Sequence, residues 1–230
     1  MTTALYAGVV ATIAASSLLL GAILAEQFKV SGVLVGPAMG FGAGALISAL
    51  AYELIPDARV SDIWIWLAFA VGALLYYGLD ALIERRLATA GLSIVLGALL
   101  DGIPESIVLG LGIAVGGSVS IGFLVAVFVS NVPESLSATV DLRDSRTAGW
   151  VYRLWIAIVL VSGVSGTLGV LAAQHLPSVD GRYMQAFAAG AVLTMIADTM
   201  MPQAFQRGGR PIALLTALGF AIAAVLTLLD

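Results

Sequence analysis

The sequence has no cysteine, a single histidine and only 10% charged residues. The missing cysteine excludes disulfide scaffolds, zinc fingers with thiolate ligands and thiol catalysis. Because a soluble domain carries about 25% charged residues, the low charge excludes a water-soluble globular protein, a disordered chain and a nucleic-acid binder with a basic face. Apolar residues dominate instead, since 60% of the 230 residues are hydrophobic and the mean hydropathy is +1.07.

Apolar runs long enough to cross a bilayer follow one another along nearly the whole chain. A membrane helix needs about 20 mostly apolar residues, and these runs are continuous rather than alternating as in the strands of a membrane β-barrel. The connections are short, so we expect one transmembrane domain over residues 1–230. We predict an all-α integral membrane protein with eight transmembrane helices, at about 4–25, 33–55, 63–83, 89–115, 119–140, 151–173, 183–203 and 211–229.

The basic residues give these spans an orientation. Connections that face the cytoplasm carry an excess of Lys and Arg. Of the 10 basic residues, only Arg59 and Arg182 fall in the even-numbered connections. We therefore expect the odd-numbered connections in the cytoplasm and both termini outside. The odd-numbered connections carry Lys29, Arg85, Arg86, Arg143, Arg146, Arg153, Arg207 and Arg210.

Glycine is frequent, with 26 residues, and it recurs at helical spacing within two of the spans. Small faces let helices approach closely in lipid, where apolar burial no longer drives their association. We therefore predict that these glycines pack helices together. They are Gly36, Gly40, Gly42 and Gly44 in the second span, and Gly163, Gly166 and Gly169 in the sixth.

Three carboxylates fall near the middle of the fourth and fifth spans: Asp101, Glu105 and Glu134. An ionised carboxylate at that depth costs about 2.5–3.5 kcal/mol or more, and no basic residue is predicted at the same depth. Protons, water or a bound cation must therefore neutralise them. The structural alternative is a set of protonated acids that only hydrogen-bond between helices.

The three acids belong to a repeated motif. Residues 101–106 read Asp-Gly-Ile-Pro-Glu-Ser, and residues 130–135 read Ser-Asn-Val-Pro-Glu-Ser. Neither Pro104 nor Pro133 has an N–H to donate within its helix, so each helix should kink there. The freed carbonyl is tolerated at membrane depth where it lines a cavity. Two such kinks, each followed directly by glutamate, indicate a functional site.

The motif side chains offer oxygen ligands from two helices. Asp101 and Glu105 are four residues apart and share a helix face, and Asn131 precedes Glu134 by three residues. Carboxylates, an amide and water suit a divalent cation. Ser130 is a further candidate, one turn before Glu134. Nearer the span ends, Glu53 and Asp198 are candidates for a secondary site or for the ion pathway.

These motifs resemble those of the ZIP (Zrt-/Irt-like) metal permeases, in the form of a divergent bacterial-type member. That family has eight spans with both termini outside, and its fourth and fifth spans carry His-Asn-x-Pro-Glu-Gly repeats. Residues 53–58, Glu-Leu-Ile-Pro-Asp-Ala, are similar to the family's His-Leu-Leu-Pro-Glu-Ala, and residues 190–203 are similar to its late segment. The resemblance implies a ZIP-like bundle with kinked fourth and fifth helices, a bacterial inner membrane and a homodimer.

The resemblance also implies the ligands, and the departures from it bear on the metal. Asp101, Glu105, Asn131 and Glu134 match ligand positions of the family, but both motif histidines are replaced by oxygen-bearing residues. Zinc usually recruits nitrogen or sulfur, whereas carboxylate, carbonyl and water suit manganese and magnesium. We therefore expect a harder site than is usual in the family, with Zn²⁺, Mn²⁺, Fe²⁺ and Cd²⁺ as candidate ions.

The leading hypothesis is a permease that moves a divalent cation toward the cytoplasm, without catalytic residues, cofactor or nucleic-acid partner. No phosphate-binding loop is present, so ATP is not expected to drive it. One alternative is an intramembrane enzyme with paired carboxylates, although neither a Gly-x-Gly-Asp nor a His-Glu-x-x-His signature appears. The other is a proton-linked solute carrier, which needs pocket aromatics near the midplane. The tryptophans fall instead at predicted span ends, as interfacial anchors do: Trp64, Trp66, Trp150 and Trp155.

Overall fold

A computed structural model describes residues 2–28, 32–55, 62–86, 90–116, 120–175 and 181–227, and the described residues are almost entirely helical. Lys29, Pro56 and Arg59, on which parts of the sequence argument depend, lie outside these ranges. Two short π-helical turns, η1 and η2, interrupt the α-helices. The elements are α1 (Thr2–Ala15), α2 (Ser17–Gln27), α3 (Gly32–Ala49), η1 (Leu50–Leu54), α4 (Ile63–Arg86), α5 (Ala90–Gly116), α6 (Ile121–Leu142), α7 (Ala148–His175), α8 (Gly181–Met195), η2 (Ile196–Met200), α9 (Met201–Gly208) and α10 (Ile212–Thr227).

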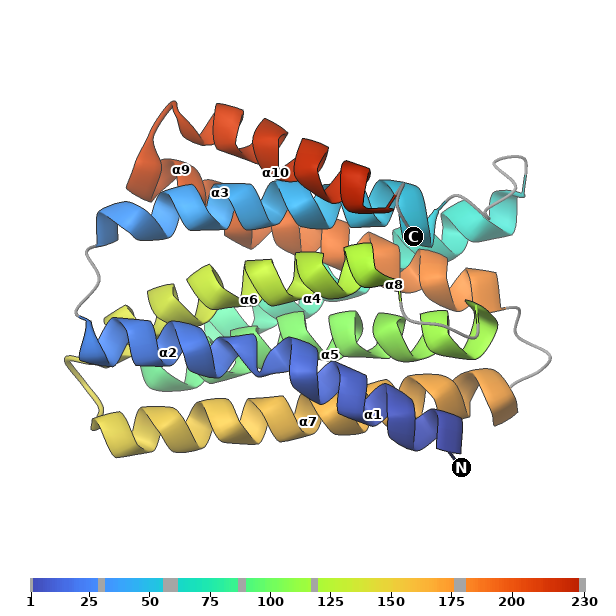
Figure 1. Cartoon of the computed structure of the whole chain (residues 1–230), viewed down its shortest axis with the longest axis horizontal. Coiled ribbons are helices and arrows are strands. Elements are labelled where there is room, and N and C mark those ends of the chain that lie inside the picture. The colour runs from blue at the N-terminus through green and yellow to red at the C-terminus, as the bar shows by residue number, and fades with distance from the viewer. Residues whose placement is uncertain are drawn as a thin grey trace.

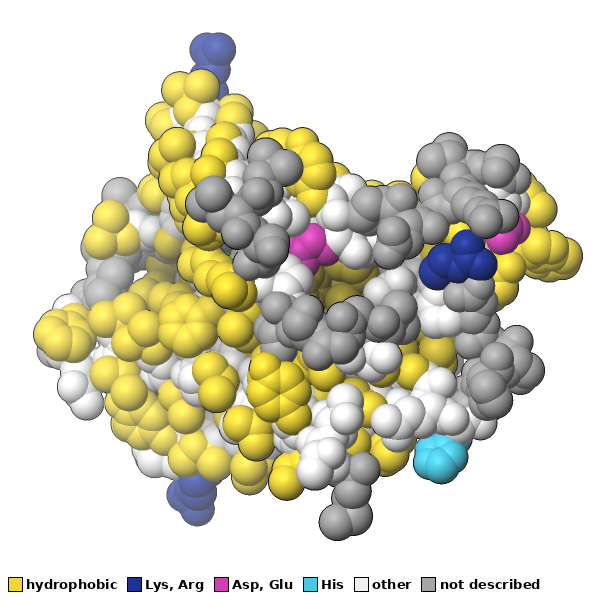
Figure 2. Space-filling view, turned by 45° about the vertical axis from the view of Figure 1, so that its right-hand side comes forward, with side chains coloured by type: hydrophobic (Ala, Val, Ile, Leu, Met, Phe, Trp, Pro, Cys, Tyr) yellow, Lys and Arg dark blue, Asp and Glu magenta, His cyan; other side chains and the backbone are white. Residues whose placement is uncertain are grey.

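The helices form a bundle that is long and apolar enough to cross a membrane. Among the described residues, seven helical segments meet the length and hydropathy of a span, and the eighth apolar helix, Ile212–Thr227, is shorter. This architecture is consistent with an integral membrane protein. In Figure 2 hydrophobic side chains cover much of the left part of the view, and few charged side chains are seen. On α4 alone, Trp64 is 65% exposed and Leu74 is 70% exposed.

Successive spans run in opposite directions along the bundle (Figure 1). The ends of α2, α6 and α9 lie together at the left of the view, and the first turn of α1 lies at the opposite end. The bundle end at which α6 and α9 finish is called the basic end below, because Arg143, Arg146, Arg207 and Arg210 follow or close these helices. There Arg207 and Asp141 form an ion pair with an N–O distance of 3.1 Å. Which side of the membrane this end faces remains a prediction.

The first span is broken once, near its middle. The sequence predicts one span at 4–25, and the structure has one over Thr2–Gln27, in which a single turn residue, Ser16, separates α1 from α2. The Ser16 hydroxyl donates to the Ile13 carbonyl at 2.6 Å, and the Ser17 hydroxyl donates to the Ala14 carbonyl at 2.6 Å. Such bonds compete with the backbone ladder and often bend helices, which accounts for the break.

Glycine packs the helices together, as the sequence predicts. A Cβ at Gly72 of α4 would collide with the Phe187 carbonyl oxygen of α8, and one at Gly190 of α8 would collide with the Phe69 carbonyl oxygen of α4. The predicted glycine faces do the same between other pairs of helices. A Cβ at Gly44 would meet the Thr216 carbonyl of α10, and glycines of the sixth span adjoin α1 and α5.

The two motif prolines lie inside continuous helices. Pro104 lies within α5 and Pro133 lies within α6, and each helix extends beyond its proline on both sides. A bend at either proline therefore remains a prediction. The π-helical turns η1 and η2 are a separate irregularity of the backbone. In η1 the Ile55 N–H donates to the Leu50 carbonyl five residues earlier, at 3.3 Å, and η2 closes in the same way, from Met201 to Ile196.

One tryptophan that was expected to be an interfacial anchor is buried instead. Trp155 was expected at a span end as an interfacial anchor, but it is fully buried, with 0% exposure. Its indole N–H donates to the Thr139 hydroxyl at 2.9 Å. The ring thus packs α7 against α6, because the bonded hydroxyl makes burial of the indole N–H inexpensive. Trp64 is exposed, as an anchor should be.

Candidate metal site

A polar cavity of about 460 Å³ lies between α3, α4, α5, α6 and the segment formed by η2 and α9. Its lining includes three aspartates and one glutamate, together with hydroxyl and amide side chains. Two methionines and short apolar residues complete the walls. The lining residues are Met39, Asp80, Ile83, Gly97, Ala98, Asp101, Glu134, Ser137, Ala138, Asp141, Thr199, Met200 and Gln203.

One acid from each repeated motif lines this cavity. Asp101 projects from α5 and is 6% exposed. Glu134 projects from α6 and is partly buried. The motif therefore places one carboxylate from each of two helices on one cavity. Within the described residues no basic side chain lines it.

The cavity runs from these two carboxylates toward the basic end. Along α6 the lining continues from Glu134 to Asp141, seven residues or about 10 Å at the rise of an α-helix. Along α5 the lining continues from Asp101 back to Gly97. Because α5 and α6 are antiparallel, both rows of lining residues lead to the basic end. The Asp141 side chain is 51% exposed. The cavity therefore reaches the molecular surface at the basic end.

The other two predicted ligands are buried one turn farther from the basic end. Glu105 is 2% exposed and Asn131 is 4% exposed. Glu105 follows Asp101 on α5, and Asn131 precedes Glu134 on the antiparallel α6, so both steps lead away from the basic end by about 5 Å. Neither residue lines the polar cavity. The four predicted ligands thus divide into an inner pair, Asp101 and Glu134, and an outer pair, Glu105 and Asn131.

The described side chains do not form a ready-made set of ligands for a metal. Among them no three His, Asp or Glu side chains lie close enough to hold one ion. A cation next to the inner pair would take two carboxylates at most and would complete its shell with hydroxyl, amide or water oxygen. Divalent cations such as Mg²⁺ and Ca²⁺ accept such mixed oxygen shells.

The three secondary candidates lie outside the cavity. The Ser130 hydroxyl donates to the Val127 carbonyl at 3.0 Å, and Ser130 packs against Gly42 of α3. Glu53 lies in η1, where its Oε1 accepts a hydrogen bond from the Thr227 hydroxyl at 2.9 Å. Asp198 lies in η2 and is exposed. The structure therefore does not bring Glu53 or Asp198 to the inner pair.

Two residues that the sequence argument did not single out belong to the site. The Tyr76 hydroxyl of α4 donates to Oδ1 of Asp101 at 2.6 Å, and it lies 3.5 Å from the Thr199 hydroxyl of η2. Asp80, on the same helix, also lines the cavity. Their spacing could have indicated this, because residues four apart share a helix face and would place both polar groups of α4 on the same side.

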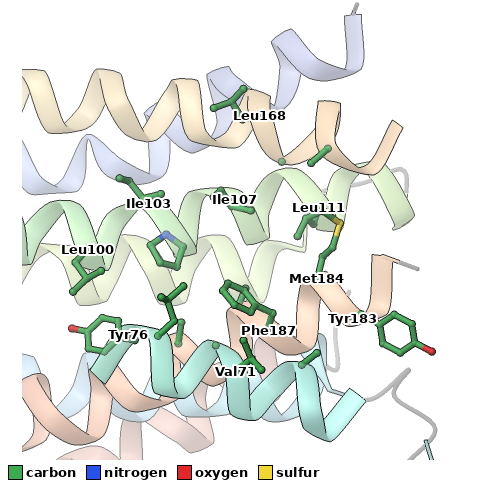
Figure 3. A pocket seen from close by; sticks show the side chains of 18 of the residues that line it. Val71, Tyr76, Leu100, Ile103, Ile107, Leu111, Leu168, Tyr183, Met184 and Phe187 are labelled. Carbon is green, nitrogen blue, oxygen red and sulfur yellow. The ribbon is translucent and has the colours of Figure 1, made fainter. Parts of the chain in front are cut away.

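Tyr76 separates the polar cavity from a second, apolar one. This second cavity has a volume of about 800 Å³ between α4, α5, α7 and α8, and apolar side chains line nearly all of it. Figure 3 shows the Tyr76 ring at its edge, near Leu100, with the phenol oxygen pointing away from the cavity. The ring therefore lines the apolar cavity, while the hydroxyl bonds to Asp101, which lines the polar cavity.

Comparison with known proteins gives no family assignment. No protein-family model matches the chain, and no curated protein matches it either.

Proposed function

We propose that this protein is a ZIP-like permease that carries a divalent metal cation across a membrane toward the cytoplasm. The observation that carries the proposal is the convergence of Asp101 and Glu134 on one polar cavity. These two acids come from the two copies of the Pro-Glu motif, on different helices. Buried acids inside a bundle of membrane-spanning helices are typical of ion pathways, because they are too costly to keep for packing alone.

The inner and outer pairs suggest a path for the cation. An ion that arrives from outside meets Glu105 and Asn131 first and then moves about 5 Å to Asp101 and Glu134. From the inner pair the polar cavity leads to the basic end, which the distribution of Lys and Arg assigns to the cytoplasm. In this conformation the inner pair is therefore open to the cytoplasmic side.

The chemistry of the lining favours a hard or intermediate cation. Its polar donors are carboxylate, hydroxyl and amide oxygens from Asp101, Glu134, Ser137, Thr199 and Gln203. Oxygen donors suit Mn²⁺ and Mg²⁺ better than Cu⁺ or Zn²⁺, which recruit thiolate and imidazole. The resemblance to ZIP permeases keeps Zn²⁺ among the candidates, and Mn²⁺ and Fe²⁺ fit the donors of this chain better.

Metal uptake into proteoliposomes tests the proposal. Purified protein is reconstituted, and the uptake of Zn²⁺, Mn²⁺, Fe²⁺ and Cd²⁺ is followed in wild type, Glu105→Gln and Glu134→Gln. We expect uptake of at least one ion by the wild type and a fall of tenfold or more in each variant, since even the loss of an outer-shell partner lowers metal affinity by about 10–100-fold.

Asp144→Asn is the matched control, because it makes the same acid-to-amide change at an exposed connection residue. Its uptake should equal that of the wild type. Unchanged uptake in both glutamate variants would remove the proposed site. If the wild type transports none of the four ions, the permease proposal is wrong, and the solute-carrier and enzyme alternatives take precedence.

A further inference from the structure

Among the described residues, Tyr76 is the one side chain that forms a hydrogen bond with a carboxylate of the inner pair. Its hydroxyl lies 2.6 Å from Oδ1 of Asp101, and the tyrosine is 3% exposed. A phenol has one proton to donate. Because that proton points at Asp101, the phenol oxygen is left as an acceptor, and the Thr199 hydroxyl lies 3.5 Å from it.

The resulting chain of hydroxyls joins three elements at one carboxylate. Thr199 lies in η2, Tyr76 on α4 and Asp101 on α5. Hydrogen bonds to a carboxylate that binds metal fix its orientation and tune its affinity. Bonds to a charged acceptor are also short and strong, in agreement with the 2.6 Å distance.

We propose that Tyr76 is a positioning residue that sets the cation selectivity of the inner pair, a role that rests on the permease function proposed above. The phenol engages Oδ1 of Asp101, so the second oxygen is left as the metal ligand and Asp101 binds through one atom. Tyr76 belongs to the main cluster of buried apolar side chains and is 3% exposed, which restricts rotation of its hydroxyl when an ion arrives.

Binding through one oxygen matters for the choice between cations. Ca²⁺ takes 6–8 oxygen ligands at about 2.3–2.6 Å and often uses both oxygens of a carboxylate. Zn²⁺ takes four ligands at about 2.0–2.2 Å from carboxylate oxygen. A site whose aspartate gives one oxygen therefore disfavours Ca²⁺ relative to smaller divalent cations.

Tyr76→Phe tests the inference, because it removes one hydroxyl and keeps the ring. The ion that the wild type transports best among Zn²⁺, Mn²⁺, Fe²⁺ and Cd²⁺ is used as the probe, with Ca²⁺ as competitor. We expect KM for the probe to rise about 10–100-fold, as for other outer-shell losses, while the maximal rate stays within about threefold. The Ca²⁺ concentration that halves uptake should fall at least tenfold.

Tyr77→Phe is the matched control, since this neighbour on α4 is 57% exposed and loses the same atom. It should keep the wild-type KM and the wild-type inhibition by Ca²⁺. If Tyr76→Phe matches Tyr77→Phe in both values while the wild type transports metal, the role of Tyr76 is wrong and the permease stands. A raised KM without stronger Ca²⁺ inhibition also overturns the selectivity role.

Thr199→Val is the second variant and decides the matter if Tyr76→Phe does not fold. Thr199→Val removes the hydroxyl that faces the phenol, so it should raise KM and strengthen Ca²⁺ inhibition, by smaller factors than Tyr76→Phe. Thr199→Ser keeps a hydroxyl and should have the wild-type values of both. Wild-type values in Thr199→Val would then overturn the proposal. Absence of transport by the wild type for all four ions overturns the permease itself, which is a separate outcome.

Discussion

Glu105 carries a carboxylate that is 2% exposed and lies outside the polar cavity. A charged group at membrane depth costs about 2.5–3.5 kcal/mol on insertion scales, and proteins keep such groups when function requires them. The fold does not need this acid for packing, because a glutamine fills the same volume and carries no charge. Replacing Glu105 by glutamine should therefore raise the stability of the protein and lower its transport of metal.

We predict that Glu105→Gln raises the free energy of unfolding by about 1–3 kcal/mol, because the amide avoids most of the roughly 2.5–3.5 kcal/mol cost of a charge at membrane depth. Thermal unfolding of the detergent-solubilised protein, without added metal, measures this change. Asp144→Asn should leave the transition where it is, because that acid is exposed. A lower transition temperature in Glu105→Gln would show that the acid stabilises the bundle and would favour the structural alternative.

At the scale of elements, close helix pairs depend on glycine rather than on large apolar side chains. The pairing of α4 with α8 shows this best, because Gly72 and Gly190 each face a backbone carbonyl of the other helix. Most other α4 side chains point outward, and only 17% of its span is buried. The α8 contact is therefore the principal attachment that holds Tyr76 and Asp80 beside the polar cavity.

We predict that Gly72→Val separates α4 from α8 and lowers the free energy of unfolding by at least about 1–3 kcal/mol, the usual effect of overpacking. The backbone carbonyl of Phe187 cannot move aside as a flexible side chain would. Gly78→Val on the same helix is the control, because a Cβ there meets nothing within 4 Å. Equal transition temperatures for the two variants would contradict the packing argument.

The π-helical turns are the elements that the sequence did not reveal. A bend at Pro104 or Pro133 remains a prediction, since both residues lie inside continuous helices. One of these turns, η2, lies just before Pro202, a residue that has no N–H to donate. Such turns are frequent at functional sites, and η2 places Thr199 in the polar cavity.

For the whole molecule, the absence of cysteine makes the orientation testable. The basic end carries most of the described arginines, so we predict that it faces the cytoplasm. A single cysteine in place of Ser145, between α6 and α7, should be protected from a membrane-impermeant maleimide in intact cells. One in place of His175, at the other end of α7, should be labelled.

Permeabilised cells provide the control, because both cysteines should then react. Labelling of the Ser145→Cys variant but not of His175→Cys in intact cells would reverse the orientation. The polar cavity would then open to the outside in this conformation, and the proposed direction of transport would lose its structural support.

The sequence alone determined the class of the molecule and the residues of chemical interest. A long continuous apolar segment in lipid forms a helix, because a helix pairs every backbone polar group within the segment. The same runs made Asp101, Glu105 and Glu134 conspicuous, since carboxylates are rare at that depth. The glycine spacing in the sixth span likewise predicted close helix contacts, and the structure confirms them.

Only the tertiary structure decided which of these residues meet. It brings Asp101 and Glu134 to one cavity, sets Glu105 and Asn131 one turn away, and leaves Glu53 and Asp198 outside. It also adds Tyr76 and Thr199, which lie 123 residues apart in the chain. Helical periodicity shows which residues share a face of one helix, but the neighbour of that face depends on how glycine surfaces fit together in three dimensions. That fit is a property of the whole bundle, so no single segment of the sequence carries it.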